Sequence, residues 1–279
     1  MTAPISLVFS AQSGAIPALG FGTSPMTGGL SAETIVTALK AGYRHLDTAR
    51  KYGTECAVGE AMRASGVARA DIFLTTKVSH KNLRAADFAR SLDESLTALQ
   101  VDSVDLLLVH WPNPEIALSE TMQALAKARR DGRARHIGVA NFNIALLDQA
   151  IKLCPEPLAV LQAEYHPYLD QSKLLAAARQ RGLVFVAYCP LGRGRLFGDP
   201  VLADIAQARG RSVAQTALRW LMQQNVAAIP FSSKPERIAE NFNVFDFSLD
   251  DGEMERIAAL KRGTGRIANP SGRVSGGWD

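Results

Sequence analysis

Residues 104–140 read VDLLLVHWPNPEIALSETMQALAKARRDGRARHIGVA. An apolar run, Val104–His110, is followed by a turn and then by Ser119–Arg130, where apolar residues recur at helical spacing. Gly132 stands where that helix should end, and His136–Ala140 is a second apolar run. This order predicts a strand, a helix and another strand. Because the strands lack a polar face, we expect them to be parallel and covered by helices.

The same unit recurs along the chain. The predicted strands are Ala18–Gly22, Arg44–Thr48, Ile72–Lys77, Val104–His110, His136–Ala140, Ala159–Glu164, Val184–Tyr188 and Ala227–Pro230. Helices between them include Ala32–Ala41, Ala85–Leu99, Ser119–Arg130, Lys173–Arg181 and Val213–Gln223, and the glycines expected to end helices are Gly42, Gly66, Gly132, Gly182 and Gly210. An open doubly wound sheet and a closed barrel both have this alternation, but eight strands favour the barrel. We therefore expect an α/β fold, a (β/α)8 TIM barrel that forms a single domain over residues 1–279.

Two segments fall outside this repeat. Ile5–Phe9 and Ala15–Pro17 flank a Gln-Ser-Gly turn, which predicts a short N-terminal β-hairpin. The segment after Lys261 is rich in Gly, Arg and Ser and contains Trp278. We expect an irregular C-terminal tail that is either packed over the barrel or partly disordered.

Charge and cysteine content argue against several classes of protein. The 31 basic and 27 acidic residues leave a net charge of only +4, and the densest basic cluster, residues 129–135, is better explained as a solvated helix end than as a nucleic-acid site. Cys56, Cys154 and Cys189 have neither metal-binding nor disulfide spacing. No apolar run reaches the roughly 18 residues of a membrane span, and the N-terminus lacks the features of a signal peptide. We expect a cytoplasmic protein with no metal, nucleic-acid or membrane partner.

Ionisable residues cluster at the carboxyl ends of consecutive predicted strands. Asp47 ends the second strand and Tyr52 lies in the loop that follows it, while Lys77 and His110 end the third and fourth strands. Each residue alone is usually structural. In a barrel, however, the carboxyl ends of the strands carry the chemistry, so we expect these four side chains to converge.

The chemistry of this group indicates proton transfer. A free tyrosine has a pKa near 10, and a neighbouring ammonium such as that of Lys77 would lower it. Asp47 could supply the counter-charge that a buried lysine requires, and His110 could orient a substrate oxygen. Since no member of the group is a source of hydride, a redox reaction would require a cofactor.

The chain resembles the aldo-keto reductase family along nearly its whole length. The resemblance rests on GFGT, YRHLDTARKYGTE, TTKV, DLLLVHWP, GVANF, QAEYHPYL, AYCPLG and IPFSSKPERIAEN, in this order and spacing. The short length, the PLG segment and the final Gly-Trp-Asp are most similar to the bacterial branch that contains the 2,5-diketo-gluconate reductases. The resemblance implies NADPH-dependent reduction of aldehydes or ketones, including keto-sugar acids or small aldehydes, by a monomeric enzyme.

The family pattern also implies residue roles. Asp47, Tyr52, Lys77 and His110 would form the catalytic set, with Tyr52 as proton donor, and Tyr52, His110 and Trp111 would bind the carbonyl substrate. Asn141 and Gln162 would hold the nicotinamide carboxamide, and Tyr188 would stack on its ring. The full set of implied cofactor contacts is Gly22, Thr23, Asp47, Asn141, Gln162, Tyr188, Leu191, Ser232, Arg237, Glu240 and Asn241. Without the resemblance, we would favour a turn residue at Asn141, a polar strand end at Gln162 and a core residue at Tyr188.

The chain departs from the family pattern at the expected adenosine site. Ser232 and Arg237 match positions that contact the 2′-phosphate of NADP+, but Phe231 stands where a lysine is common. NADPH is the expected cofactor because Arg237 keeps a guanidinium suited to phosphate, and NADH is the alternative. Two pocket positions also depart from the pattern: Ser79 replaces a tryptophan and Ala140 a serine.

Three other interpretations compete with these expectations. GRGRLFG at Gly192–Gly198 is similar to a dinucleotide fingerprint, but its spacing and late position instead favour a flexible loop near the cofactor. A barrel aldolase with a Schiff base on Lys77 would need a desolvated lysine and a carbonyl substrate, and Asp47 and Tyr52 beside the lysine favour the reductase. A non-catalytic nicotinamide-binding module that senses redox state is the remaining alternative, since a barrel does not dictate function.

Overall fold

The computed structural model describes residues 8–11, 14–24, 30–263, 265–270, 274 and 277–279, and its centre is a parallel sheet of eight strands. These strands are β3 (Phe21–Gly22), β4 (His45–Asp47), β5 (Phe73–Val78), β6 (Val104–Val109), β7 (Ala134–Ala140), β8 (Val160–Glu164), β9 (Val184–Tyr188) and β10 (Val226–Ala228). Neighbours in the chain are neighbours in the sheet, from β3 to β10 without a crossover. This order is that of a barrel and not of a doubly wound sheet.

Backbone hydrogen bonds between the two outermost strands close the barrel. Gly20 N donates to Ala228 O at 2.9 Å, and Ala228 N donates to Ala18 O at 2.9 Å. Gly22 N donates to the carbonyl of Pro230 at 3.0 Å, and a Cβ on Gly22 would lie only 2.9 Å from a neighbouring backbone oxygen. As regular strands, β3 and β10 are shorter than the predicted strands Ala18–Gly22 and Ala227–Pro230. Residues next to β3 and β10 in the chain still form the hydrogen bonds that close the barrel, and we call this closure the seam.

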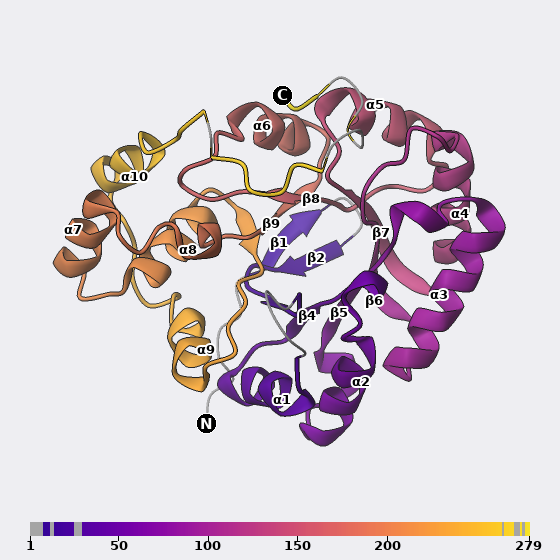
Figure 1. The fold of residues 1–279 in the computed structure, drawn as a ribbon, viewed down its shortest axis with the longest axis horizontal. Coiled ribbons are helices and arrows are strands. Elements are labelled where there is room, and N and C mark those ends of the chain that lie inside the picture. The colour runs from indigo at the N-terminus through magenta and orange to yellow at the C-terminus, as the bar shows by residue number, and fades with distance from the viewer. Residues whose placement is uncertain (1–7, 12–13, 25–29, 264, 271–273, 275–276) are drawn as a thin grey trace.

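Helices surround the barrel as an outer ring (Figure 1). They are α1 (Ala32–Ala41), α2 (Glu55–Ala64), α3 (Ala85–Leu99), α4 (Leu118–Arg130), α5 (Ile144–Leu153), α6 (Ser172–Gln180), α7 (Pro200–Ala208), α8 (Val213–Gln223), α9 (Pro235–Phe242) and α10 (Asp251–Ala258). The predicted bounds of α1, α3 and α8 are confirmed to the residue, and α8 begins with a capping box between Ser212 and Gln215. The five glycines predicted to end helices all have positive φ.

Other predicted bounds differ by one or two residues. The second strand is shorter than Arg44–Thr48, and the third begins and ends one residue later than Ile72–Lys77. The strand predicted as His136–Ala140 begins at Ala134, and the helix predicted as Lys173–Arg181 is shifted by one residue. Such ends depend on which backbone groups find partners in neighbouring elements, and a single sequence does not contain that information.

An antiparallel hairpin covers the amino-terminal end of the barrel. Strands β1 (Val8–Ala11) and β2 (Gly14–Pro17) pair with Phe9 opposite Ile16. Strand β1 contacts β9, and a Cβ on Gly14 would collide with the ring of His136 near the start of β7. Figure 1 shows the hairpin across the centre of the barrel. The predicted hairpin is confirmed in part, because residues 5–7 of its first segment lie outside the described residues.

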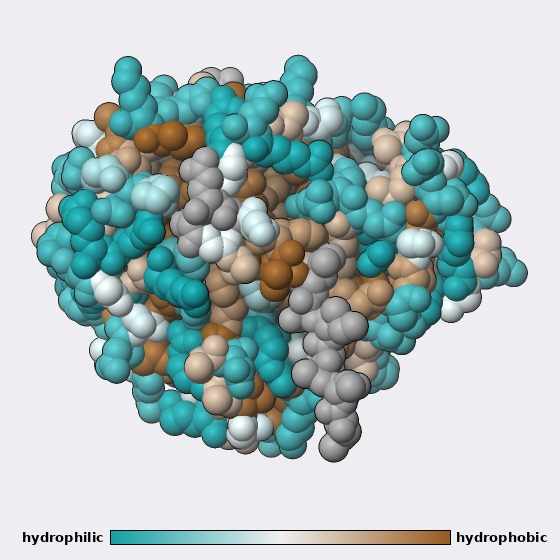
Figure 2. All heavy atoms as spheres, turned by 180° about the vertical axis from the view of Figure 1, so that it is seen from behind, coloured by the Kyte–Doolittle hydropathy of each residue, from teal (hydrophilic) through white to brown (hydrophobic). Residues whose placement is uncertain are grey.

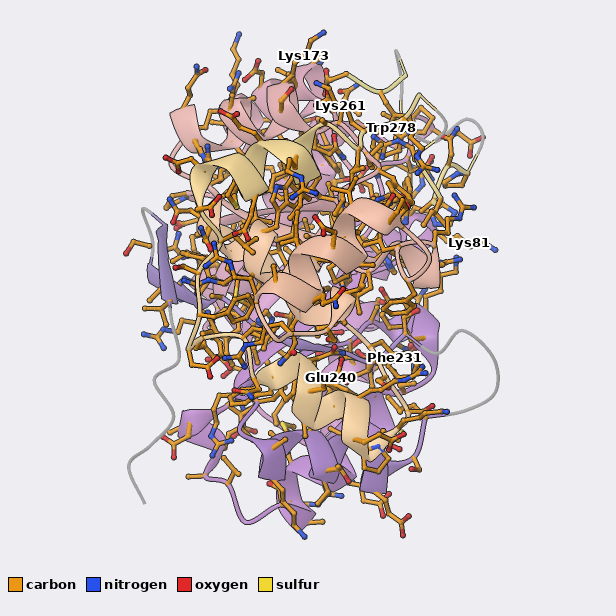
Figure 3. All side chains as sticks on the ribbon, turned by 90° about the vertical axis from the view of Figure 1, so that its left-hand side faces the viewer. Lys81, Lys173, Phe231, Glu240, Lys261 and Trp278 are labelled. Carbon is orange, nitrogen blue, oxygen red and sulfur yellow. The ribbon has the colours of Figure 1, made fainter. Side chains whose placement is uncertain are left out.

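The opposite end of the barrel is open. Figure 1 looks into this open end, whereas Figure 2 shows the opposite, hairpin-covered end, where hydrophobic side chains lie toward the middle and hydrophilic ones around the rim. In the side view of Figure 3, Phe231 and Lys81 lie toward the open end, on the right.

The tail beyond α10 runs past α6 to α5 (Figure 1) and contains neither helix nor strand in its described residues. Backbone hydrogen bonds such as Arg262 N to Tyr168 O, at 2.9 Å, hold it against the barrel. The prediction of an irregular, packed tail is thus confirmed for these residues. Within the described residues, no helix is long and apolar enough to cross a membrane.

Candidate active site

A cavity of about 550 Å³ opens at the carboxyl ends of the strands. Residues from β3, β4 and β6 to β10, or from the loops that follow them, line it. They include ten residues predicted from sequence: Gly22, Thr23, Asp47, Tyr52, His110, Trp111, Asn141, Gln162, Tyr188 and Leu191. The volume lies within the range of small-molecule and cofactor sites.

A buried ion pair forms the floor of this site. The ammonium of Lys77 binds Oδ1 of Asp47 and donates to the carbonyl of Thr48 at 2.9 Å. The second carboxylate oxygen, Oδ2, accepts from Nε2 of Gln162 at 2.8 Å. Strands β4, β5 and β8 supply the three side chains, and all three are buried. The charges are therefore both paired and hydrogen-bonded, as burial requires.

The surroundings of Lys77 keep it charged. Burial would lower the pKa of the ammonium, but the charge of Asp47 and the neighbouring Tyr52 together raise that pKa above its ordinary value. Because its pKa is raised, Lys77 stays protonated at neutral pH and places a positive charge beneath the cavity.

Tyr52 lies above this charge, at the end of the short 3-10 helix Arg50–Tyr52. Its hydroxyl is 3.4 Å from Nε2 of His110, and the two rings are nearly perpendicular, with centroids 5.4 Å apart. The ammonium of Lys77 is 5.1 Å from the centroid of the tyrosine ring. The four ionisable side chains that the sequence placed at strand ends therefore lie together.

The predicted direction of the Tyr52 pKa shift is wrong for this structure. Burial raises the pKa of the phenol, and this outweighs the ammonium of Lys77, which lowers it, while the carboxylate of Asp47 adds to the rise. The expectation from sequence took only the ammonium of Lys77 into account for the pKa of Tyr52. The barrel mouth also removes water and holds the lysine in a pair with an anion, and both effects disfavour the phenolate.

Asn141, at the end of β7, connects the site to Tyr188. Its backbone is in the left-handed region, with φ of 64°, and its Nδ2 donates to the carbonyl of His110 at 2.8 Å. The hydroxyl of Tyr188 donates to Oδ1 of Asn141 at 2.7 Å. The backbone of Asn141 therefore has a turn conformation, and Asn141 also lines the cavity. Tyr188 is only partly buried and lines the cavity.

The four residues predicted for the adenosine end do not line this cavity. Phe231 lines it, but Ser232, Arg237, Glu240 and Asn241 are not among its lining residues. Figure 3 labels Phe231 and, on α9, Glu240. Ser232 accepts the backbone N–H of Lys234 at 3.1 Å. Lys234 and Arg237 are exposed at the start of α9, whereas Asn241 is buried. Their predicted roles stay predictions.

Sequence reasoning missed several lining residues. Lys51 and Arg193 bring two exposed cations to the cavity, Cys189 contributes a thiol and Ala268 comes from the tail. The loop that contains Arg193 was predicted to lie near the cofactor, and positive φ values at Gly192, Arg193 and Gly194 curl it at the cavity. No sequence signal identified Ala268, because it is an ordinary residue in an irregular segment.

A closed eight-stranded barrel with a polar cavity at the carboxyl ends of its strands defines the class of barrel enzymes. The aldo/keto reductase family profile matches residues 18–262. The chain is 44% identical over 262 residues to morphine 6-dehydrogenase of Pseudomonas putida, which covers 89% of this chain and 88% of that protein. The chain belongs to the aldo/keto reductase family and is an oxidoreductase.

Solved structures agree with this assignment. One, provisionally described as a 2,5-diketo-D-gluconic acid reductase B, superposes with a TM-score of 0.94 at 44% identity and covers 98% of each chain. Another, an aldo-keto reductase in complex with NADPH, has a TM-score of 0.87 at 32% identity and covers 92% of this chain and 88% of that one. The resemblance to the diketo-gluconate reductase branch is thereby confirmed at the level of similarity.

Proposed function

We propose that this protein reduces aldehydes or ketones to alcohols, with NADPH as hydride donor and Tyr52 as proton donor. The observation that carries the proposal is the position of the Tyr52 hydroxyl, which lies at the cavity beside His110 and above the buried pair of Lys77 and Asp47. A phenol whose pKa is raised keeps its proton at neutral pH, as an acid in the reductive direction must.

The cavity suits a nicotinamide. Asn141 and Gln162 carry amide groups, each of which has two donor hydrogens and an acceptor oxygen with two lone pairs. Each can therefore bind a second amide in addition to its present partners, which are two for Asn141 and one for Gln162. The ring of Tyr188 lies at the same cavity and offers a flat surface for stacking. When bound there, NADPH would supply the hydride that no side chain can provide.

The start of α9 suits the 2′-phosphate of NADPH. Arg237 and Lys234 are exposed cations at the amino-terminus of an eight-residue helix, where the helix dipole also favours an anion. Phe231 offers an aromatic ring at the nearby end of the cavity in place of a charge. NADPH is therefore the proposed cofactor, and Arg237 is the main discriminating residue against NADH.

The proton transfer follows from the site geometry. As a hydride adds to the carbonyl carbon, the two electrons of the C=O π bond move to the oxygen, which takes the proton of Tyr52. The phenolate left behind is stabilised by the ammonium of Lys77, which Asp47 holds in place. His110, 3.4 Å from the same hydroxyl, is placed to hydrogen-bond the substrate oxygen and orient it.

An aldolase is disfavoured by the state of Lys77. A Schiff base requires a neutral amine, whereas Asp47 and Tyr52 raise the pKa of Lys77 and keep it an ammonium. No specific observation favours a non-catalytic sensor over the reductase.

The decisive experiment follows nicotinamide oxidation by the purified protein. A panel of aldehydes, ketones and keto acids is tested with NADPH and with NADH, and Tyr52→Phe is the matched control. We expect turnover with NADPH that requires a carbonyl compound and is lost in the variant. Tight NADPH binding without turnover for every carbonyl compound would instead support the sensor.

A further inference from the structure

Three threonine hydroxyls form a buried chain next to the loop that carries Tyr52. The hydroxyl of Thr54 lies 3.1 Å from that of Thr48 and 3.1 Å from that of Thr23. All three residues are buried, with at most 3% of each exposed. A hydroxyl has one donor hydrogen and two acceptor lone pairs, so Thr54 can hydrogen-bond both neighbours at once. The side chain of Thr54 therefore joins two segments of the chain to its own.

Both neighbours of Thr54 directly follow strands of the candidate site. Thr48 follows β4, and its carbonyl accepts from the ammonium of Lys77 at 2.9 Å. Thr23 follows β3 and lines the cavity, and its N–H donates to the carbonyl of Asp47 at 2.9 Å. Through these two threonines the hydroxyl chain reaches both members of the buried ion pair.

Thr48 and Thr54 are also the two ends of the segment that contains Tyr52. Residues 49–53, which we call the Tyr52 loop, include the short 3-10 helix, and α2 begins immediately after Thr54. Inside the loop, the N–H of Tyr52 donates to the carbonyl of Ala49 at 2.9 Å. The contact between the hydroxyls of Thr48 and Thr54 thus closes the loop at its base.

The hydroxyl of Thr54 does not have the usual role of a threonine at the start of a helix. Thr54 is the N-cap of α2, where a side-chain oxygen commonly accepts an N–H of the first turn. Its hydroxyl accepts none of those N–H groups, all of which the structure describes. Its carbonyl accepts from Val58 N at 3.0 Å, a bond that does not involve the side chain. Loss of the hydroxyl should therefore loosen the Tyr52 loop more than α2.

A second side chain keeps the start of α2 in place. Glu55, the first residue of the helix, is buried, and its Oε1 accepts from the hydroxyl of Thr76 at 2.6 Å. Thr76 precedes Lys77 in β5. The helix therefore stays attached to β5 when the hydroxyl of Thr54 is removed, so a substitution there should act locally.

We propose that Thr54 is a positioning residue that fixes the Tyr52 loop, so that the phenol hydroxyl stays beside His110. This inference rests on the proposed reductase function and names a further residue on which it depends. The hydroxyl of Tyr52 is 3.4 Å from Nε2 of His110, a contact that a small shift of the loop would break. A general acid must lie within hydrogen-bond reach of the group it protonates. A displacement of about 1 Å can cost up to about a hundredfold in rate.

The first test compares Thr54→Val with Thr54→Ser. Valine keeps the shape of threonine without the hydroxyl, whereas serine keeps the hydroxyl. The substrates are NADPH and benzaldehyde, or the carbonyl compound that wild type reduces fastest. We expect kcat of the valine variant to fall at least about tenfold, and the serine variant to stay close to wild type. KM and the Kd for NADPH should change little, since Thr54 is not among the described residues that line the cavity. An unchanged kcat in the valine variant, or a loss that serine does not rescue, would overturn the proposal.

Thr121→Val is the matched control. Thr121 is a buried residue of α4, and its hydroxyl donates to the carbonyl of Leu83 at 3.3 Å. This substitution also removes a buried threonine hydroxyl, but it leaves the contacts of the Tyr52 loop intact. We expect it to lower the melting temperature without lowering kcat. Parallel losses of kcat and stability in both valine variants would mean that Thr54 only supports the fold.

The second test asks whether the loss acts through the proton donor. A displaced phenol slows proton transfer, so the ratio of kcat in ordinary water to kcat in deuterium oxide should rise in Thr54→Val and not in Thr121→Val. A lower kcat with an unchanged ratio would show that another step is affected, and would refute the assigned role.

Hydrogen exchange of amides 49–53 tests the position of the loop independently of turnover. We expect faster exchange in Thr54→Val than in wild type, Thr54→Ser or Thr121→Val, and equal exchange in all four would contradict the proposal. A wild-type protein that oxidises NADPH with no carbonyl compound would instead refute the proposed function. The exchange comparison would still report whether Thr54 holds the loop, so the two failures can be distinguished.

Discussion

The hydroxyl of Tyr52 lies 3.4 Å from Nε2 of His110, with the two rings nearly perpendicular. A carbonyl oxygen placed between these groups would have a proton donor on one side and an orienting ring nitrogen on the other. The roles of the two residues can therefore be separated by substitution.

Tyr52→Phe keeps the ring and removes the acid. We expect kcat to fall at least about a hundredfold, the low end for general acid catalysis, while the Kd for NADPH stays the same. Steady-state kinetics and fluorescence titration measure the two quantities. Near-normal turnover in this variant would show that Tyr52 is not the proton donor.

Lys77→Met should abolish most activity and also destabilise the fold, because it leaves Asp47 charged and buried without its partner. Breaking a buried pair costs about 3–5 kcal/mol, which denaturant unfolding will measure. Asp47→Asn combined with Lys77→Met should recover much of that stability without recovering turnover. Recovery of both would mean that the pair serves only the fold.

Lys77→Arg tests the shape of the cation. A planar guanidinium cannot occupy the position of a compact ammonium between Asp47 and the Thr48 carbonyl, so we expect poor rescue of kcat. Full activity in this variant would show that a diffuse positive charge beneath Tyr52 is sufficient.

Arg237→Ala should weaken NADPH binding selectively. A guanidinium meets a phosphate with charged hydrogen bonds worth about 1.5–3 kcal/mol, and NADH has no such phosphate. Both dissociation constants are measured by quenching of intrinsic fluorescence, with Lys234→Ala as a neighbouring comparison. Equal losses for the two cofactors would indicate a structural role, and a wild-type preference for NADH would contradict the NADPH assignment.

We expect the buried side chain of His45 to make the protein less stable in mild acid. Burial lowers its pKa to about 4, although the carboxylate of Asp47 opposes this, whereas the unfolded chain has an ordinary value near 6.5. Between these two values the unfolded state binds more protons, so stability falls as pH falls from about 6.5 to 4 and then levels for this group. The difference between the two pKa values of His45 corresponds to a loss of about 3 kcal/mol in the free energy of unfolding. Denaturant unfolding across this pH range should give a shallower slope in His45→Gln, and an unchanged slope would contradict the assignment.

The fold was largely predictable because the pattern that encodes it is local. The apolar runs at β6 and β9 and the spacing in α3 and α8 each carry their own signal, and glycines end the helices. The seam between β3 and β10 was predictable only in outline. Its hydrogen bonds join residues more than 200 positions apart, and a short regular strand can be extended by such bonds without a pattern of its own.

The candidate site divides in the same way. The sequence alone determined that Asp47, Tyr52, Lys77 and His110 follow parallel strands, and barrel topology then requires such residues to meet at one end. Only the tertiary structure decided the electrostatic state of Tyr52, since burial outweighs the lysine charge. It also decided that the tail is held to Glu164 and that Trp278 stands beside Trp111. Desolvation and contacts between distant segments depend on what surrounds each group in space, and the local order of residues does not record those surroundings.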